Sequence, residues 1–493
     1  MQNPETLFEL VKSLNATEKR YFQVYATRFA SDKQKSNYQR LFDDLNNWAT
    51  DKYSDTEFRK KFRKRSYMKN FAWEKNQLFE LILKVMRNYR TGTDPEIRAH
   101  EMMIDVQFLL SKNRMIEAYR MLEKLYELAE DAELFAEQMN VLNYMHNLNI
   151  RSSKLKQITA AEFELKENEL LEKVRLQRQV RIYNSYLFEI DRNDEWQPRR
   201  QEAERIYTQL EECAKHPLLP KRSRLMYLAC ANTYHDAMRN YEAAFEAASE
   251  VVALLKNPEY AFLSQSPSRI ISGYGNYLAA AMMLERFDLY PPILAELKQL
   301  KCQTDLEEME RWYGVVTDEI IYLMNVKKYE SIDELIKYTD SGIAKYANKL
   351  PEGKIITLNC NLSLLCFFSR NYIQSQKYIN QLLDYVGRSS RYNFITVLMR
   401  TLELINHLLL REYDLADMKW RSYRRLIQQQ SPSLLLDYVT EAIGKKIHQA
   451  DNRPPDVKTI DKVLQMNPTS QWIQLLAIMQ QWPVTDKGNH RPQ

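Results

Sequence analysis

Glycine is scarce in this chain: it occurs 9 times among 493 residues, whereas an average protein contains about 7% glycine. A β-rich fold needs glycine for bulges and tight turns, and many nucleotide-binding α/β enzymes need it for the loops that hold phosphate groups. Leu, Ala, Glu, Lys, Gln and Met, which favour helices, are abundant. The composition therefore predicts an all-α protein.

Disulfides, long apolar runs and targeting signals are lacking too. The 5 cysteines have irregular spacings without a CxxC pair, which favours reduced thiols over a disulfide framework or a zinc site. The apolar run "LAAAMML" at 278–284 is far shorter than the roughly 18 residues of a membrane span. The first ten residues, "MQNPETLFEL", lack the basic-then-apolar pattern of a signal peptide. We expect a soluble, cytoplasmic protein with no membrane partner.

Motifs for catalysis and nucleotide binding are missing as well. GxxxxGK[ST], GxGxxG, HExxH and GxSxG do not occur, and "SGYGNY" at 272–277 lacks the third glycine of a nucleotide loop. The 7 histidines are scattered. We therefore predict that the protein is not an enzyme and has no catalytic, cofactor-binding or metal-binding residues.

A helical pattern recurs along most of the chain. Tyr372 is followed by "IQSQKYINQLL", and Tyr413 by "DLADMKWRSYRRLI", with a small residue three places after each tyrosine and large apolar residues seven and ten places after it. These offsets lie on one stripe of a helix with 3.6 residues per turn. We call the first residue of each copy its marker. The markers are Met115, Trp196, Tyr241, Phe287, Tyr329, Tyr372 and Tyr413, with a weaker copy near Ile158.

The spacing of the markers indicates a structural repeat. Successive markers lie 81, 45, 46, 42, 43 and 41 residues apart, and the copy near Ile158 divides the first interval. Regular self-similarity at 20–50 residues is typical of helical arrays. We interpret each marker as the start of the second helix of a helical hairpin. If the marker plugs the hairpin core, Tyr372→Ala should lower the free energy of unfolding by about 3–5 kcal/mol.

The pattern resembles the tetratricopeptide repeat, in which an aromatic residue opens the second helix and alanine follows three places later. Tyr241 with Ala244 and Tyr413 with Ala416 carry the resemblance best, and it covers roughly residues 97–430. The family's usual period of 34 is shorter, and the lysine–asparagine clamp of some members is not evident. The family's glycine, nine places before the marker, is replaced by Asn232, Leu278, Ile320, Ser363 and Leu404. The resemblance implies an α-solenoid of stacked hairpins. From the repeat and the missing catalytic motifs we expect its concave surface to bind a protein or peptide.

Composition and turn signals divide the chain. "TGTDPE" at 91–96 combines Gly, Asp and Pro, which predicts a boundary followed by a capped helix. We expect a basic helical domain at 1–92, about eight hairpins at 93–432, capping helices at 433–482 and a disordered tail at 483–493. Within the first domain we expect helices at 4–14, 17–30, 36–49, 54–65 and 67–89.

The first domain is basic. Residues 1–90 carry a formal charge of +8 and the rest of the chain −3. The segment "FRKKFRKRSYMKNF" at 58–71 contains no acidic residue, which fits a site for nucleic acid or another polyanion. It equally fits a solvated helix end, because cations suit the dipole at a helix C-terminus. The candidate polyanion-binding residues are Arg59, Lys60, Lys61, Arg63, Lys64 and Arg65.

The remaining candidates follow from the repeat. Asn276 and Asn361 each stand eleven residues before a marker and are candidate contacts in a partner-binding groove. His235 and His407 share a position in two copies, where we expect core or groove residues. The sequence thus predicts a scaffold that binds a protein or peptide. The alternative is a regulator whose first domain binds nucleic acid while its repeats sense a partner.

Overall fold

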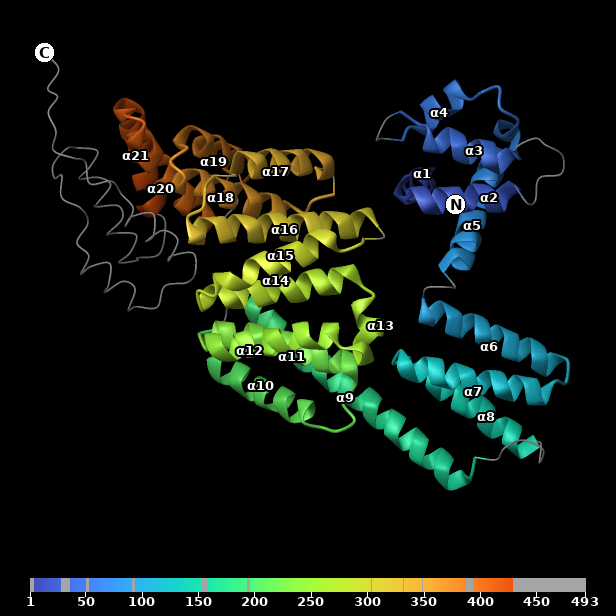
Figure 1. Ribbon diagram of the computed structural model, residues 1–493. Coiled ribbons are helices and arrows are strands. Elements are labelled where there is room, and N and C mark those ends of the chain that lie inside the picture. Colours follow the sequence, from blue (N-terminus) through green and yellow to red (C-terminus); the bar gives the residue numbers. More distant parts are fainter. Residues whose placement is uncertain are drawn as a thin grey trace, which may run out of the picture. The chain divides into compact units, whose positions relative to one another are not determined.

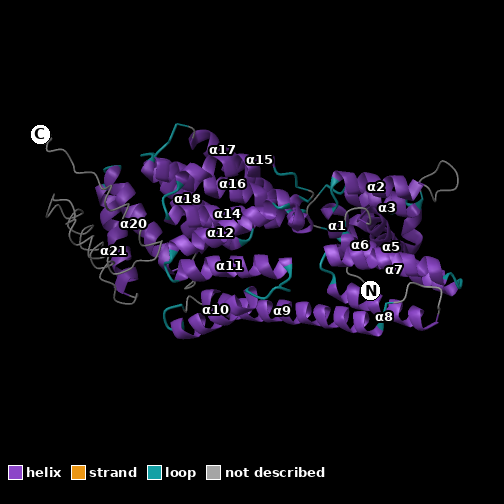
Figure 2. Ribbon diagram, turned by 60° about the horizontal axis from the view of Figure 1, so that its bottom comes forward, coloured by secondary structure: helices purple, strands orange, loops and turns teal. Residues whose placement is uncertain are grey.

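The structure is a computed structural model of the chain. It describes residues 4–27, 36–49, 53–90, 94–151, 158–192, 196–302, 304–330, 332–347, 349–386 and 393–428. Every regular element in these ranges is a helix (Figures 1 and 2), which confirms the all-α prediction. The helices expected at 433–482 and the tail at 483–493 lie outside the described residues.

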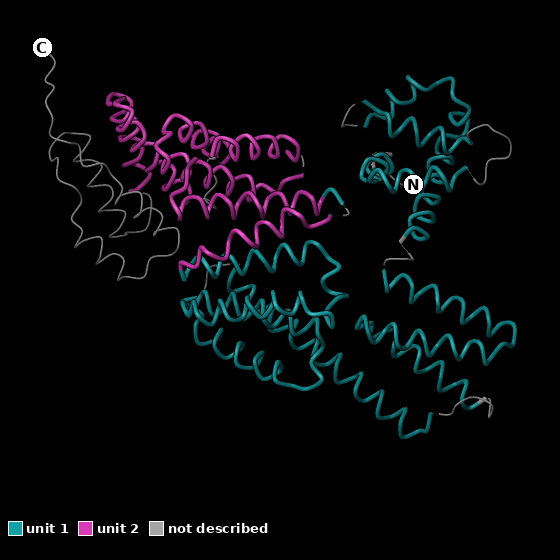
Figure 3. Tube along the Cα trace, in the orientation of Figure 1, with its two compact units in different colours: residues 1–284, 302–305 teal, residues 285–301, 306–493 magenta. Residues whose placement is uncertain are grey.

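The chain divides into two compact units (Figure 3). The first comprises residues 1–284 with 302–305, and the second residues 285–301 with 306–493. The helices up to residue 90 are α1 (Pro4–Ser13), α2 (Ala16–Thr27), α3 (Asn37–Asn46), α4 (Asp55–Lys61), the 3₁₀ helix η1 (Ser66–Asn70) and α5 (Phe71–Arg90). They surround one hydrophobic cluster, in which Phe22, Phe42 and Phe58 are fully buried.

The rest of the first unit continues with longer helices, most of which pack on their neighbours along the chain. They are α6 (Pro95–Ser111), α7 (Met115–Asp131), α8 (Phe135–Arg151), α9 (Ala160–Arg192), α10 (Arg200–Ala214), α11 (Lys221–Ala237), α12 (Tyr241–Lys256), η2 (Pro258–Tyr260), α13 (Ala261–Ser264) and α14 (Pro267–Met283). As expected at "TGTDPE", Asp94 caps α6 by accepting hydrogen bonds from the backbone N–H groups of Glu96 and Ile97.

The second unit has the same character. Its helices are η3 (Phe287–Leu289), α15 (Tyr290–Gln299), α16 (Asp305–Val326), α17 (Ile332–Tyr346), α18 (Glu352–Phe368), α19 (Tyr372–Val386), α20 (Asn393–Leu409) and α21 (Tyr413–Gln428). Among the described residues, one hydrophobic cluster joins α16, α17 and α18, and another joins α18 through α21.

One backbone turn precedes most of the markers. The residue two places before six of the seven markers has a positive φ, a conformation that non-glycine residues rarely adopt. After five of these six residues the next N–H bonds to the carbonyl five residues back, as from Asn371 to Cys366 at 2.8 Å; such bonds close helix C-termini. The six residues are Asn113, Arg239, Glu285, Lys327, Arg370 and Arg411, with φ values between 55° and 66°.

The markers themselves are less buried than expected. Tyr372 is half-buried beside Phe367, and Tyr413 is 54% exposed. The residue three places later is the buried one in each of six copies: Ala118, Ala244, Tyr290, Ile332, Ser375 and Ala416. The first residue of a helix lies at the edge of the packed face, whereas the next turn faces the neighbouring helix. Tyr372→Ala should therefore lower the free energy of unfolding by about 2 kcal/mol, less than full burial implies.

The copy expected near Ile158 is not formed as predicted. Leu165, which should lie on its buried stripe, is 61% exposed. The helix α9 instead runs for 33 residues, because no glycine or proline occurs between Ala160 and Arg192 to end it.

Glu133 joins two distant segments of the first unit. It stands in the turn between α7 and α8, and its Oε1 accepts from the backbone N–H of Lys221. Its Oε2 accepts from the N–H of Arg222 at 2.9 Å. The carboxylate thereby caps α11, where the positive end of the helix dipole favours an anion.

Candidate functional site

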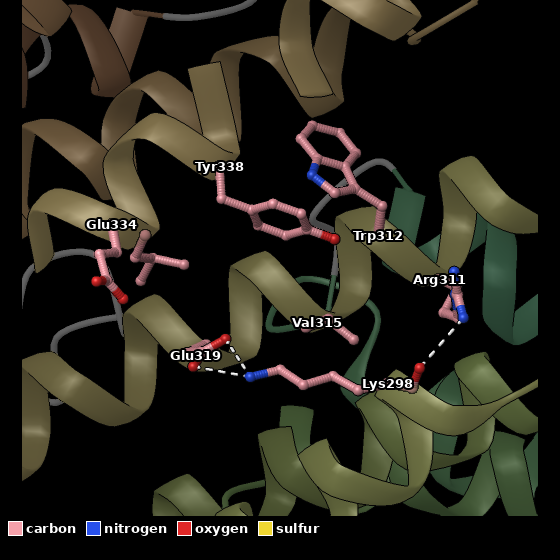
Figure 4. Close-up of a pocket in the computed structure, with 8 residues that line it drawn as sticks. Lys298, Arg311, Trp312, Val315, Glu319, Glu334 and Tyr338 are labelled. Atoms are coloured by element: carbon pink, nitrogen blue, oxygen red, sulfur yellow. Dashed lines mark hydrogen bonds and ion pairs between the residues drawn. The ribbon is translucent and has the colours of Figure 1, made fainter. Parts of the chain in front are cut away.

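A pocket of about 360 Å³ opens in the second unit, where three consecutive helices meet. Volumes of this order are common for ligand sites. Figure 4 shows the Tyr338 ring reaching from α17 toward Trp312 on α16. The helix α15 contributes Lys298, α16 contributes Arg311, Trp312, Val315 and Glu319, and α17 contributes Glu334, Leu335 and Tyr338.

Most of the charge in this pocket is already paired. The Lys298 Nζ lies 2.8 Å from the Glu319 Oε2, and the Arg311 Nη1 donates to the backbone oxygen of Lys298 at 3.2 Å (Figure 4). The Arg311 Nη1 also donates to the backbone oxygen of Leu300 at 2.9 Å. Within the described part of the chain, the exposed carboxylate of Glu334 has no such partner. The formal charges of the pocket therefore sum to zero, and Glu334 is the carboxylate that no cation of the pocket pairs.

The wall of the pocket depends on a glycine. A Cβ at Gly342 of α17 would lie 2.1 Å from the Trp312 ring, so only glycine lets the indole lie against that helix. Trp312 is 5% exposed, and its Nε1 is fully buried without a hydrogen-bond partner among the described residues. That nitrogen is out of reach of a ligand, so the indole contributes an apolar surface to the pocket.

A buried acid lies on the same helix. Asp318 of α16 is buried, and its Oδ2 has no hydrogen-bond partner in the described ranges. Burial raises the pKa of this carboxyl to about 7, because a charged carboxylate is poorly solvated inside a protein. Asp318 in turn adds to the increase that burial causes in the pKa of Tyr290 on α15.

The six basic residues predicted at 59–65 are all exposed, but they divide into two groups. The Arg59 guanidinium bonds Asp55 at 2.7 Å and lies 4.7 Å from the centre of the Phe71 ring. Lys61 lies 4.9 Å from the Trp48 ring, and Arg65 bonds Asp44 at 3.0 Å. We call these three the anchored cations.

The other three, Lys60, Arg63 and Lys64, have no partner within the described ranges. We call them the free cations. Lys60 lies in the last turn of α4, and Arg63 and Lys64 lie just after the helix ends; the buried residue Phe58 fixes α4 against the hydrophobic cluster. The structure therefore leaves a cationic surface at the position that the sequence indicated.

The two predicted groove residues lie in different surroundings. Asn276 on α14 is exposed, whereas Asn361 on α18 is buried. The two side chains therefore do not present equivalent surfaces, and a role in partner binding stays a prediction for each.

The histidines and thiols considered from the sequence have structural contacts. The Tyr207 hydroxyl lies 2.9 Å from the His235 Nε2, and burial lowers the pKa of His235. The His407 Nδ1 lies 2.7 Å from the Glu412 Oε2. Burial raises the pKa of the Cys366 thiol to about 12, which keeps it in the unreactive thiol form.

The sequence did not reveal the pocket, although one signal was present. Gly342 is one of only 9 glycines and stands inside a helical pattern, where glycine is unfavourable unless a neighbour requires it. Its partner Trp312 stands thirty residues away on another helix, and no pattern within one helix connects the two.

Comparisons with known proteins identify no relative: no family model, no curated protein and no solved structure matches the chain. In the part of the chain that the structure describes, no group of three or more His, Cys, Asp or Glu side chains is arranged to hold a metal ion. None of the described helices combines the length and apolar character that crossing a membrane requires.

Proposed function

We propose that this protein is a non-enzymatic helical-repeat scaffold, similar in construction to tetratricopeptide-repeat proteins, that binds a protein or peptide partner. One observation carries the proposal. A positive-φ turn stands two residues before six of the seven markers, so a backbone feature recurs at the positions where the side-chain pattern recurs. Hairpins of one kind, repeated along a chain, bury their faces by stacking and produce extended surfaces that suit protein ligands.

The pocket between α15, α16 and α17 supports the same proposal. It combines apolar walls with a few charged groups, which suits a side chain of a bound peptide. The expected location is the cytoplasm, where the free thiols of the described chain remain reduced.

The experiment is isolation of the full-length chain, carrying an affinity tag, from cells that make it naturally. Native mass spectrometry should show a complex with fixed stoichiometry, and the purified partner should rebind the purified chain. Failure to find any stoichiometric partner, together with turnover of a substrate by the isolated chain, would overturn the scaffold proposal.

A second candidate function is a regulator whose first domain binds nucleic acid. The free cations Lys60, Arg63 and Lys64 favour it, because side chains without internal partners remain available for phosphate groups. The logarithm of the binding constant for double-stranded DNA falls linearly with the logarithm of the salt concentration. Each phosphate contact that is lost should make this slope shallower by about one.

This second function is tested by fluorescence anisotropy with double-stranded DNA at low and moderate salt. The variant Lys60→Gln/Arg63→Gln/Lys64→Gln should lose binding. Lys301→Gln/Lys328→Gln/Lys337→Gln removes the same charge from exposed positions of the second unit and should retain it. Equal binding by both triple variants would exclude a nucleic-acid site at the free cations.

A further inference from the structure

The pocket between α15, α16 and α17 contains one carboxylate that its own residues leave unpaired. Lys298 is bound to Glu319, and Arg311 is bound to two backbone oxygens. Glu334 stands in the first turn of α17 with an exposed side chain. A positively charged group of an occupant would therefore give the Glu334 carboxylate the partner that it lacks.

The walls indicate the shape of that occupant. Val315 and Leu335 are buried apolar residues, and Tyr338 is 51% exposed. Figure 4 shows the Tyr338 ring extending across the pocket between Glu334 and Trp312. Such walls accommodate an aliphatic stem, and an exposed aromatic face next to a carboxylate suits a planar cation.

We propose that this pocket receives an arginine side chain of the partner, an inference that rests on the proposed scaffold function. The guanidinium binds the Glu334 carboxylate and lies against the Tyr338 ring, while the methylene groups contact Val315 and Leu335. Arginine fits better than lysine because its planar fork matches a carboxylate and stacks on an aromatic ring.

Other occupants fit the same pocket less well. A purely apolar side chain would shield Glu334 from water without replacing its hydrogen bonds, which is unfavourable. An acidic side chain would face Glu334 and Glu319, while Lys298 and Arg311 already donate to other groups. The balance of contacts therefore selects a cation with an apolar stem.

The test uses the full-length chain with 5-fluorotryptophan at its 7 tryptophans. The Trp312 signal in the fluorine NMR spectrum is assigned from its loss in Trp312→Phe. The probe is N-acetyl-arginine amide, with the citrulline compound as a neutral isostere and the norleucine compound as an apolar one. We expect a saturable shift of the Trp312 signal with a dissociation constant on the order of 1–10 mM.

The citrulline compound should bind about tenfold more weakly. Glu334→Gln should bring the ratio of the two affinities close to one. Glu352→Gln should leave the ratio unchanged; Glu352 is also an exposed first-turn glutamate but belongs to α18, outside the pocket. Equal affinities in the wild-type chain, tighter binding of the norleucine compound, or no response to the arginine compound would each overturn the proposal.

The same variants separate this inference from the scaffold function. Once a stoichiometric partner is purified, Glu334→Gln should weaken its complex at least about tenfold, and Glu352→Gln should not. A partner that binds both variants equally would overturn the arginine site and leave the scaffold function standing. Binding of the arginine compound in a chain that has no stoichiometric partner would overturn the scaffold function alone.

Discussion

Two neighbouring regions of the second unit differ in how they satisfy a buried carboxylate. In α15–α17, the Asp318 Oδ2 and the Trp312 Nε1 are buried without hydrogen-bond partners among the described residues. In α18–α21, Glu403 is 1% exposed and lies 2.8 Å from both the Arg400 Nη1 and the Lys419 Nζ. The first region leaves an oxygen of its buried acid without a described partner, and the second places two cations on its buried acid.

Buried amides do not follow this contrast, because Asn359, Gln376 and Asn406 of α18–α20 each have a buried oxygen without a described partner. In α18–α21 the Ser375 hydroxyl donates to the Ser363 carbonyl at 2.8 Å and accepts from the Asn406 Nδ2 at 3.0 Å. Asn406 is thereby held in place even though its Oδ1 has no described partner. Local rules of packing and hydrogen bonding are most often broken at functional sites. The region that contains the pocket is also the region with the unpaired acid and the helix-to-helix contact at glycine.

Asp318→Asn should produce the largest change, because it removes the unpaired acid. The pKa of Asp318 rises from 3.8 to about 7 in the folded chain, so the folded state keeps a proton that the unfolded state has already released. The free energy of unfolding therefore falls as pH rises from about 4 to about 7, by up to about 4 kcal/mol. Relative to wild type, the variant should be more stable at pH 8 and nearly equal at pH 4.

Urea unfolding of both proteins at three pH values measures this difference. Asp384→Asn, at an exposed position of α19, is the control and should change stability by less than about 0.5 kcal/mol at any pH. If Asp318→Asn were less stable than wild type at pH 8, the carboxylate would be paired and the contrast between the two regions would be wrong.

Glu403→Gln should lower the free energy of unfolding, whereas Asp318→Asn should raise it at pH 8. It removes the acid that Arg400 and Lys419 share, and breaking a buried ion pair on one side is strongly destabilising. Because both cations are about one-third exposed and regain water, we expect a loss of about 3 kcal/mol. Chemical denaturation with a double-mutant cycle checks this: Lys419→Met should have less effect in Glu403→Gln than in wild type. Additive effects would show that the pair is not coupled.

Gly342→Ala tests the contact that forms the pocket wall. The new methyl group would overlap the Trp312 ring, and overpacking by this amount outweighs the better helix propensity of alanine. We expect a net loss of about 2 kcal/mol in thermal or urea unfolding. The matched variant is Gly275→Ala in α14, where nothing lies within 4 Å of the new Cβ, and it should gain about 1 kcal/mol. A gain at both positions would mean that Trp312 does not lie against α17.

The sequence predicted the helices better than the site. The helices expected at 4–14 and 67–89 correspond to Pro4–Ser13 and Phe71–Arg90, because caps and apolar periodicity are local properties. The stretch after Ile158 was misjudged, since its offsets matched a buried stripe although Leu165 is 61% exposed. Periodicity shows that a helix has an apolar face but not whether a neighbour covers it.

The free cations and the pocket show the same limit of prediction from sequence. The free cations at 60–64 were visible as a run of charge, but their separation from the anchored cations was not, because Asp44 and Trp48 reach that surface from another part of the domain. The pocket was invisible because Lys298, Trp312 and Tyr338 come together only when three helices pack. Helix starts can be predicted from a single stretch of the chain, whereas contacts between helices cannot.

The smallest predicted effect concerns the positive-φ turns in both regions. Arg370 stands two residues before α19. The Asn371 N–H bonds to the Cys366 carbonyl, and the Asn371 side chain accepts from the Gln374 N–H at 3.2 Å, so this turn is held at both ends. Lys327 has a φ of 55°, but α17 begins only at Ile332. Arg370→Gly should gain about 1 kcal/mol by removing left-handed strain. Lys327→Gly should gain less, because its turn is closed only on the α16 side, by the bond from the Lys328 N–H to the Leu323 carbonyl, and relaxes its strain on the other side. Arg370→Ala keeps the strain and should gain nothing, so equal gains for Ala and Gly in urea unfolding would mean that the arginine side chain, not the backbone, is the unfavourable element.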